Sequence, residues 1–260
     1  MFGLEGFAAI VTGGGKGIGK GITTSLARAG VRVCINYNAT KDLAEKTRDE
    51  LLKEGADVFI YKTDVADKNQ CRAMADEAVK RFGRLDILIN NAALQTNDSV
   101  IEANLSGYKR LMDVNAKGAA LMMQACVKYL KQSPRGRIIN ISSVHGKRPT
   151  DCDAVYSMSK GALQMLTREA AIEFGKYGIS VNSILPGGTM IEYKTEPGSE
   201  YGDVTKNSTV AGPPGEDRSR YVAGVGMPYH SGDLIVYLCS ESAGHLTGAA
   251  IRLDGGLMIT

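Results

Sequence analysis

The sequence predicts one α/β domain, with a doubly wound parallel sheet of about seven strands flanked by helices. Two observations carry this prediction. Short apolar runs alternate with amphipathic segments along nearly the whole chain, which is the pattern of repeated β-α-β units. The chain has 260 residues, 43% of them hydrophobic, and no linker-like stretch divides it. One domain is therefore expected over residues 1–260, and its length is ample for a sizeable core.

The strands are predicted from short apolar runs, because a parallel strand is covered on both faces and needs no polar side. The first run is Phe-Ala-Ala-Ile-Val, and a glycine cluster follows it. The predicted strands are residues 7–11, 31–35, 57–61, 85–89, 137–141, 179–185 and 249–253.

The helices are predicted from apolar residues at helical spacing between these runs. In the first helix Ile22 and Leu26 lie four apart, and Gly30 stands where a helix is expected to end. The predicted helices are residues 18–29, 41–55, 69–82, 111–130, 156–177 and 231–240.

One segment, residues 189–228, has no regular pattern and is rich in Gly, Pro, Ser and Glu. It contains Pro213-Pro214-Gly215. A loop of this length in a compact domain is usually functional, so the segment is predicted to be a substrate lid.

Charge and cysteine usage exclude several classes of protein. The formal net charge is only +3, without a run of five or six like charges, so nucleic-acid binding is not expected. No apolar run approaches the roughly 20 residues needed to cross a bilayer, and no basic leader opens the chain, so a cytoplasmic protein is expected.

The five cysteines form no Cys-x-x-Cys pair, which favours buried, reduced thiols over a metal site or disulfides. They are Cys34, Cys71, Cys126, Cys152 and Cys239.

A glycine-rich turn, Thr-Gly-Gly-Gly-Lys-Gly-Ile-Gly at residues 12–19, joins the first strand to the first helix. Glycine is needed where a pyrophosphate approaches bare backbone, and the N-terminus of the following helix favours its negative charge. The turn therefore predicts a dinucleotide cofactor in a Rossmann-type fold. The residues expected to contact it are Gly13, Gly15, Lys16, Gly17, Ile18 and Gly19.

The kind of dinucleotide is predicted from charge. Folds that select NAD place a carboxylate about 20 residues after the glycine turn, where it binds the ribose 2′-hydroxyl. Here that region is Asn36-Tyr37-Asn38, and Lys16 stands in the turn itself. A missing anion and a nearby cation favour NADP(H), with NAD left open.

Tyr156 and Lys160 lie four residues apart at the start of a predicted helix, and so on one face of it. A nearby ammonium stabilises a phenolate and lowers the pKa of a tyrosine, which makes Tyr156 a candidate acid/base. Ser143 follows a predicted strand, where its hydroxyl can bind a substrate oxygen. Asn115 falls inside a predicted helix, although asparagine is a poor helix former, so a specific reason for it is expected.

Taken together, these motifs resemble the short-chain dehydrogenase/reductase family in their order and intervals. They are Thr12-Gly-x-x-x-Gly17-Ile18-Gly19, Asn90-Asn91-Ala92, Asn115, Ser143, Tyr156-x-x-x-Lys160, Pro186-Gly187 and Asp254-Gly255-Gly256. Departures from the family pattern are Ala93, where glycine is common, and the unusual segment 228–233.

The resemblance implies a role for each catalytic residue. Tyr156 would be the general acid in reduction and the base in oxidation. Lys160 would lower the pKa of Tyr156 and hold the nicotinamide ribose. Ser143 would orient the carbonyl, and Asn115 would anchor a water that relays protons to Lys160. The mechanism needs neither His145 nor His230.

The resemblance also implies further contacts and an assembly. A homotetramer would form through the helices predicted at 111–130 and 156–177. The implied cofactor contacts are Asp64 and Val65 at the adenine, Asn38 at the adenosine ribose or its phosphate, Asn91 and Gly187 in the cleft, and Thr189 at the carboxamide.

Three short stretches resemble the sequences of bacterial glucose 1-dehydrogenases: residues 35–38, 142–145 and 186–190. This resemblance implies a sugar or polyol as substrate. A hydroxysteroid and a 3-oxoacyl thioester remain alternatives. The thioester would require a basic patch for its acidic carrier, to which Arg218 and Arg220 would contribute. A non-catalytic NADP-binding sensor would be expected to lack at least one member of the catalytic set, and all are present.

Overall fold

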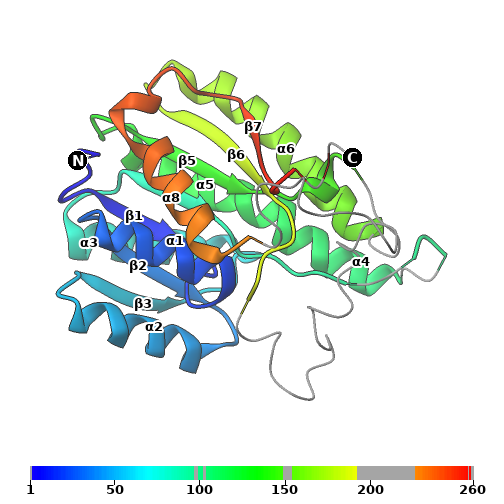
Figure 1. Cartoon of the computed structure of the whole chain (residues 1–260), viewed down its shortest axis with the longest axis horizontal. Coiled ribbons are helices and arrows are strands. Elements are labelled where there is room, and N and C mark those ends of the chain that lie inside the picture. Colours follow the sequence, from blue (N-terminus) through cyan, green and yellow to red (C-terminus); the bar gives the residue numbers. More distant parts are fainter. Residues whose placement is uncertain are drawn as a thin grey trace.

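The computed structural model describes residues 2–96, 99–101, 104–148, 154–191, 226–256 and 258. Within these residues the chain forms a seven-stranded sheet in the order β3-β2-β1-β4-β5-β6-β7, and every neighbouring pair is parallel. Helices cover both faces of the sheet (Figure 1). The predicted doubly wound α/β fold is confirmed.

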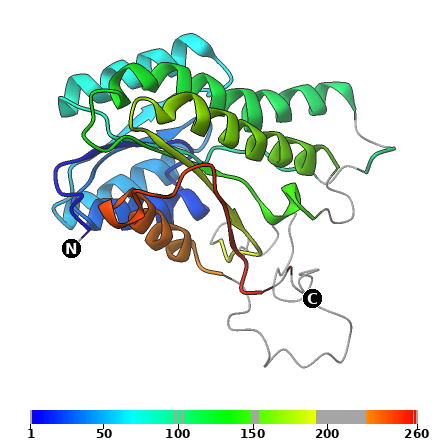
Figure 2. The same cartoon turned by 90° about the horizontal axis from the view of Figure 1, so that it is seen from above.

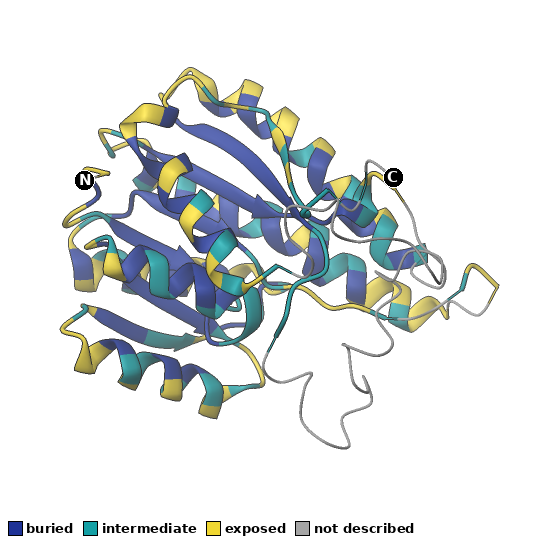
Figure 3. Cartoon of the chain, in the orientation of Figure 1, coloured by how far each residue is buried: buried dark blue, intermediate teal, exposed yellow. Residues whose placement is uncertain are grey.

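The strands begin and end within two residues of their predicted bounds. Figure 3 shows the central strands as the most deeply buried part of the chain, as expected for strands covered on both faces, whereas the last strand, at the edge of the sheet, is partly exposed. The strands are β1 (Ala8–Val11), β2 (Arg32–Tyr37), β3 (Val58–Lys62), β4 (Ile87–Asn90), β5 (Arg137–Ile141), β6 (Ser180–Pro186) and β7 (Ala250–Leu253).

The long helices also follow the predictions, with two differences. The last one begins at Pro228 instead of residue 231, because proline is well suited to the first helical turn. The helix predicted at 111–130 starts earlier and is interrupted by a π-helical turn, η1 (Asp113–Lys117). The helices are α1 (Gly17–Arg28), α2 (Lys41–Lys53), α3 (Lys68–Phe82), α4 (Leu105–Met112), α5 (Gly118–Leu130), α6 (Ala154–Gly175) and α8 (Pro228–Cys239).

Two apolar cores lie on opposite faces of the sheet. One is formed with α3, α5 and α6, and the other with α1, α2 and α8. Figure 2 shows these two helical layers with the sheet between them. The strand order reverses between β1 and β4, which is where ligands bind in folds of this kind, at the carboxyl ends of the strands.

The cysteine prediction is confirmed for four of the five thiols, since Cys34, Cys71, Cys126 and Cys239 are free and buried. Burial raises the pKa of Cys71 and Cys239 to about 12. Cys152 lies outside the described residues.

The described part of the chain contains no candidate for a membrane span or for a metal site. No helix there is both long and apolar enough to cross a bilayer. No group of three or more His, Cys, Asp or Glu side chains is placed to hold a metal ion there.

Candidate active site

The predicted site residues converge on one edge of the sheet. Because all strands run in the same direction, the segments that follow β1, β4, β5 and β6 leave from the same edge. These segments carry the glycine turn, Asn91, Ser143 and Gly187. Residues far apart in the sequence therefore share one site.

The glycine turn has no space for a side chain at Gly15 or Gly19. Gly13 and Gly17 have positive φ angles of 61° and 52°. A Cβ atom on Gly15 would lie 2.6 Å from the Cα of Ala44, and one on Gly19 would collide with the carbonyl oxygen of Gly13. The backbone of the turn is thus packed tightly against itself and against α2.

The N-terminus of α1 fits a phosphate. Its N-cap residue, Lys16, makes no side-chain capping bond. All residues of α1 are described, and its first turn carries no acidic residue. The first N–H groups of a helix have no partner within the helix and attract anions. The turn and helix therefore suit the pyrophosphate of a dinucleotide.

Asn36 secures the glycine turn. Its Oδ1 accepts a hydrogen bond from the Gly13 N–H at 3.0 Å, and its Nδ2 donates to the carbonyl oxygens of Tyr37 and Thr63, each at 3.1 Å. This buried side chain is therefore committed to the protein. Asn38, two residues on, is exposed. The sequence analysis missed the structural role of Asn36, whose only signal was its position at a strand end.

Asn91 holds the same turn from the other side. Its Nδ2 donates to the carbonyl oxygens of Thr12 and Gly13, at 2.8 and 3.1 Å, and its backbone N–H donates to the Thr12 Oγ1 at 2.8 Å. Both donors of the Asn91 amide are used in these bonds, so its side chain shapes the cleft by fixing the turn.

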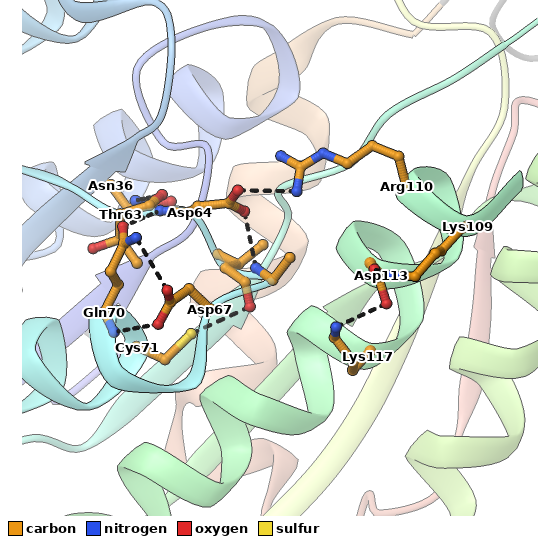
Figure 4. A network of polar contacts seen from close by, with 12 residues as sticks. Asn36, Thr63, Asp64, Asp67, Gln70, Cys71, Lys109, Arg110, Asp113 and Lys117 are labelled. Carbon is orange, nitrogen blue, oxygen red and sulfur yellow. Dashed lines mark hydrogen bonds and ion pairs between the residues drawn. The ribbon is translucent and has the colours of Figure 1, made fainter. Parts of the chain in front are cut away.

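Asp64, expected at the adenine, is paired with a residue that the sequence analysis did not single out. Its Oδ2 lies 2.9 Å from Nη1 of Arg110, on α4, and its Oδ1 accepts from the Ala66 N–H (Figure 4). The neighbouring Val65 is buried and contacts Gly118, where a Cβ would lie 2.8 Å from the Val65 Cγ2. The end of β3 is thus tied to the helix that leads to Asn115.

Asn115 lies in the π-helical turn, and the hydrogen bonds of its side chain explain a polar residue inside a helix. Its Nδ2 donates to the Leu94 carbonyl at 2.8 Å and to the Ser159 Oγ at 3.0 Å, and its Oδ1 accepts from the Leu94 N–H. Ser159 in turn donates to the Tyr156 carbonyl oxygen at 2.7 Å. The Asn115 side chain therefore joins the segment after β4 to the first turn of α6.

Tyr156 and Lys160 lie on the first turns of α6. Lys160 is only 2% exposed, its Nζ donates to the Ile141 carbonyl oxygen at 2.8 Å, and it lies 5.5 Å from the centre of the Tyr156 ring. Burial lowers the pKa of Lys160 from its ordinary 10.5 to about 7. The ammonium and the phenol are therefore neighbours, as the four-residue spacing predicts.

Ser143 follows β5 and precedes a short 3₁₀ turn, η2 (Val144–Gly146). It is buried, and its Oγ accepts from the His145 N–H at 3.2 Å. The His145 ring lies edge-on to the Tyr156 ring, with centres 6.3 Å apart. Ser143, Tyr156 and Lys160 thus come together at the junction of β5 and α6.

The residues after β6 contact β7 and the segment that precedes α8. The Gly187 N–H donates to the Leu253 carbonyl at 3.0 Å, and the Thr189 Oγ1 donates to the Gly187 carbonyl at 3.2 Å. Thr189 also forms a parallel bridge with Gly226. Residues 192–225 of the predicted lid, which include Pro213-Pro214-Gly215, Arg218 and Arg220, lie outside the described residues.

His230 has a structural position. Its Nδ1 accepts from the Met227 N–H at 3.1 Å and so helps to cap the N-terminus of α8. This bond explains the residue without a catalytic role.

Comparison with known proteins places the chain among related sequences and structures. The sequence model described as short chain dehydrogenase matches residues 8–201. Glucose 1-dehydrogenase 2 of Bacillus subtilis is 30% identical over 263 residues, covering 98% of this chain and 96% of that protein. A 3-oxoacyl-(acyl-carrier-protein) reductase of Staphylococcus aureus is 31% identical over 250 residues, with 96% and 97% covered. A short chain dehydrogenase from Burkholderia cenocepacia, solved in complex with NADP, superposes with a TM-score of 0.85 at 28% identity, and 98% of each chain is covered.

The burial of Lys160 makes stability depend on pH. Because its folded pKa of about 7 lies below its ordinary 10.5, the unfolded chain binds more protons between these values, and stability rises with pH there. Replacing Lys160 by Met removes this contribution. Between pH 7 and 10 the free energy of unfolding of the wild type should rise by roughly 2–4 kcal/mol more than that of the variant. Urea denaturation across this range, with the exposed Lys53→Met as control, measures it. Parallel pH profiles of the wild type and Lys160→Met would contradict the prediction.

Proposed function

Since the chain belongs to the short-chain dehydrogenase family, we propose that it interconverts a secondary alcohol and a carbonyl compound, prefers NADP(H), and uses Tyr156 as its acid/base. It is an NAD(P)-dependent oxidoreductase acting on CH–OH groups. The observation that carries the proposal is the buried Lys160 ammonium beside the Tyr156 ring, at the edge of the sheet that also carries Ser143. Residues 1–260 would form this one catalytic domain.

The proposed chemistry assigns one task to each side chain. When bound, the nicotinamide supplies a hydride to the carbonyl carbon or accepts one from the alcohol carbon. In reduction the Tyr156 hydroxyl donates its proton to the carbonyl oxygen, and in oxidation the phenolate takes the proton of the alcohol. The Ser143 Oγ donates a hydrogen bond to the same oxygen as negative charge develops on it.

Lys160 stabilises the phenolate and helps to return its proton. An ammonium beside the ring lowers the pKa of Tyr156, since it favours the charged form of the phenol. With a pKa of about 7, Lys160 is itself able to exchange a proton near neutrality. The Asn115 side chain is used in contacts with Leu94 and Ser159, so the proposed relay through a water would use another group of this residue.

Three observations support a preference for NADP(H). Residues 36–38 bring no carboxylate to the end of β2, and Asn36 is committed to the glycine turn. Lys16 is half-buried in that turn, where its ammonium suits a 2′-phosphate, and burial lowers its pKa. The related Burkholderia cenocepacia protein was solved with NADP.

A sugar or polyol is the proposed substrate. The similarity to glucose 1-dehydrogenase 2 of Bacillus subtilis supports it, and His145 adds a polar ring beside Tyr156, where a hydroxyl next to the reacting carbon would need a partner. A 3-oxoacyl thioester is the second candidate, because the Staphylococcus aureus relative is a reductase of that class.

A homotetramer is proposed from an exposed face of α6. Met158, Met165 and Ile172 lie at intervals of seven residues and are 55%, 52% and 79% exposed. Apolar residues at this spacing form one stripe along a helix, and such a stripe is suited to packing against another helix.

The catalytic assignment is tested by Tyr156→Phe. The wild type should oxidise NADPH with a carbonyl substrate or reduce NADP⁺ with a sugar, and the variant should lose about 10²–10⁴-fold in kcat because no proton donor remains. Tyr177→Phe, two residues after the end of α6, is the matched control and should keep full activity. A panel of sugars, steroids, acyl thioesters and simple ketones identifies the substrate, and kcat/KM values highest for thioesters would support the second candidate. Equal turnover by the wild type and Tyr156→Phe would refute the mechanism.

The cofactor assignment is tested by Lys16→Ala. Loss of one charged contact to the 2′-phosphate should weaken NADPH binding about tenfold and leave NADH binding nearly unchanged. Fluorescence titration of both cofactors measures this. Lys20→Ala is the control, because that ammonium pairs with Glu50 at 2.9 Å. An equal loss for both cofactors would instead place Lys16 on the phosphates that they share.

The assembly is tested by light scattering after size exclusion. A species of about four times the 27.7 kDa subunit mass is expected, and Met165→Glu should shift it to smaller species because a charge would then be buried in the interface. A single 27.7 kDa species for the wild type would rule out the tetramer.

A further inference from the structure

The proposed mechanism needs Ser143 and Tyr156 at a fixed separation, yet they belong to different elements. Ser143 lies between β5 and the η2 turn, whereas Tyr156 and Lys160 lie on α6. A displacement of about 1 Å among catalytic side chains can lower the rate of catalysis about 10²-fold. The contacts between η2 and α6 are therefore of functional interest.

One side chain on α6 reaches across to the serine turn, residues 142–146, which follows β5. Gln164 lies one helical turn after Lys160 and is only 7% exposed. Its Nε2 donates to the Ser142 Oγ at 3.1 Å and to the Ser143 carbonyl oxygen at 3.4 Å. The Ser142 Oγ donates in turn to the Lys160 carbonyl oxygen at 2.9 Å. Gln164 and Ser142 thus bind the backbone of the catalytic serine to the helix of the catalytic lysine.

The turn also rests directly on the helix backbone. A Cβ atom on Gly146 would lie 2.5 Å from the Gln164 Nε2 and 2.7 Å from the carbonyl carbon of Lys160. On the facing side, a Cβ on Gly161 would lie 3.4 Å from the Gly146 carbonyl oxygen. The absence of a side chain at Gly146 therefore lets η2 approach α6 closely enough for the Gln164 bonds to form.

A buried amide whose only task was to fill space would be less suitable here than an apolar side chain, because burying a polar group is unfavourable unless it is hydrogen-bonded. Both donor bonds recorded for the Gln164 amide go to the two residues of the serine turn. We infer that Gln164 is a positioning residue, which holds the Ser143 hydroxyl at the correct distance from Tyr156. This inference rests on the proposed function.

The experiment is a double-mutant cycle on Gln164 and Ser143. Gln164→Met keeps the length of the side chain and removes its donors. It should lower kcat about 10–100-fold while the Kd for NADPH stays unchanged. In the Ser143→Ala background the same substitution should cause no further loss, since residues that act as a unit are not additive.

Two further variants serve as a control and as a second test. Gln132→Met replaces an exposed glutamine after α5, whose Nε2 donates only locally to the Lys128 carbonyl, and should behave as wild type. Gln164→Leu also removes the N–H donors and introduces no charge into this buried position. It should reproduce the loss in kcat even where Gln164→Met folds poorly, as judged by thermal unfolding.

The outcomes separate the inference from the proposed function. Wild-type kcat in Gln164→Met and Gln164→Leu, or an equal fold-loss with and without Ser143, would overturn the positioning role and leave the proposed function intact. A Ser143→Ala variant as active as the wild type would overturn the catalytic assignment, and the positioning role with it.

Discussion

The site depends on one unfavourable placement, a lysine ammonium removed from water. A buried cation is tolerated only where it is hydrogen-bonded and where its charge is partly suppressed. Lys160 meets the first condition through the carbonyl oxygen of Ile141, at the end of β5, and the second through a pKa near 7. The end of β5 and the start of α6 are therefore joined by the same group that is proposed to activate Tyr156.

Around this group, buried amide side chains fix the loops that leave the sheet. Backbone groups in a loop lack the regular partners of a strand or helix, so side chains must supply them. Asn36 and Asn91 hold the glycine turn, Asn115 joins the segment after β4 to α6, and Gln164 holds the serine turn. Each amide links residues more than 20 positions apart or on different elements, so the loops of the site are held together at several points.

The sheet, the glycine turn and the Tyr156–Lys160 pair were predictable, because each leaves a local pattern in the sequence: an apolar run, a glycine cluster, a four-residue spacing. The contacts of Asn36, Arg110 and Gln164 were not, since their partners are distant in the chain and polar residues at strand ends or on helices have many ordinary explanations. For Asn115, the sequence indicated that a poor helix former inside a helix has a specific role, but it did not show what that role is. The Asn115 side chain is hydrogen-bonded to Leu94 and Ser159, which lie 21 and 44 residues away, and no local pattern encodes these partners.

The buried thiols have a practical consequence. Only the thiolate is alkylated, and Cys34, Cys71, Cys126 and Cys239 are both shielded and held protonated by the apolar core. A maleimide or iodoacetamide therefore reaches these four sulfurs only when the surrounding structure opens. The rate of their modification thus measures opening of the sheet and its helices directly, without any label introduced into the chain.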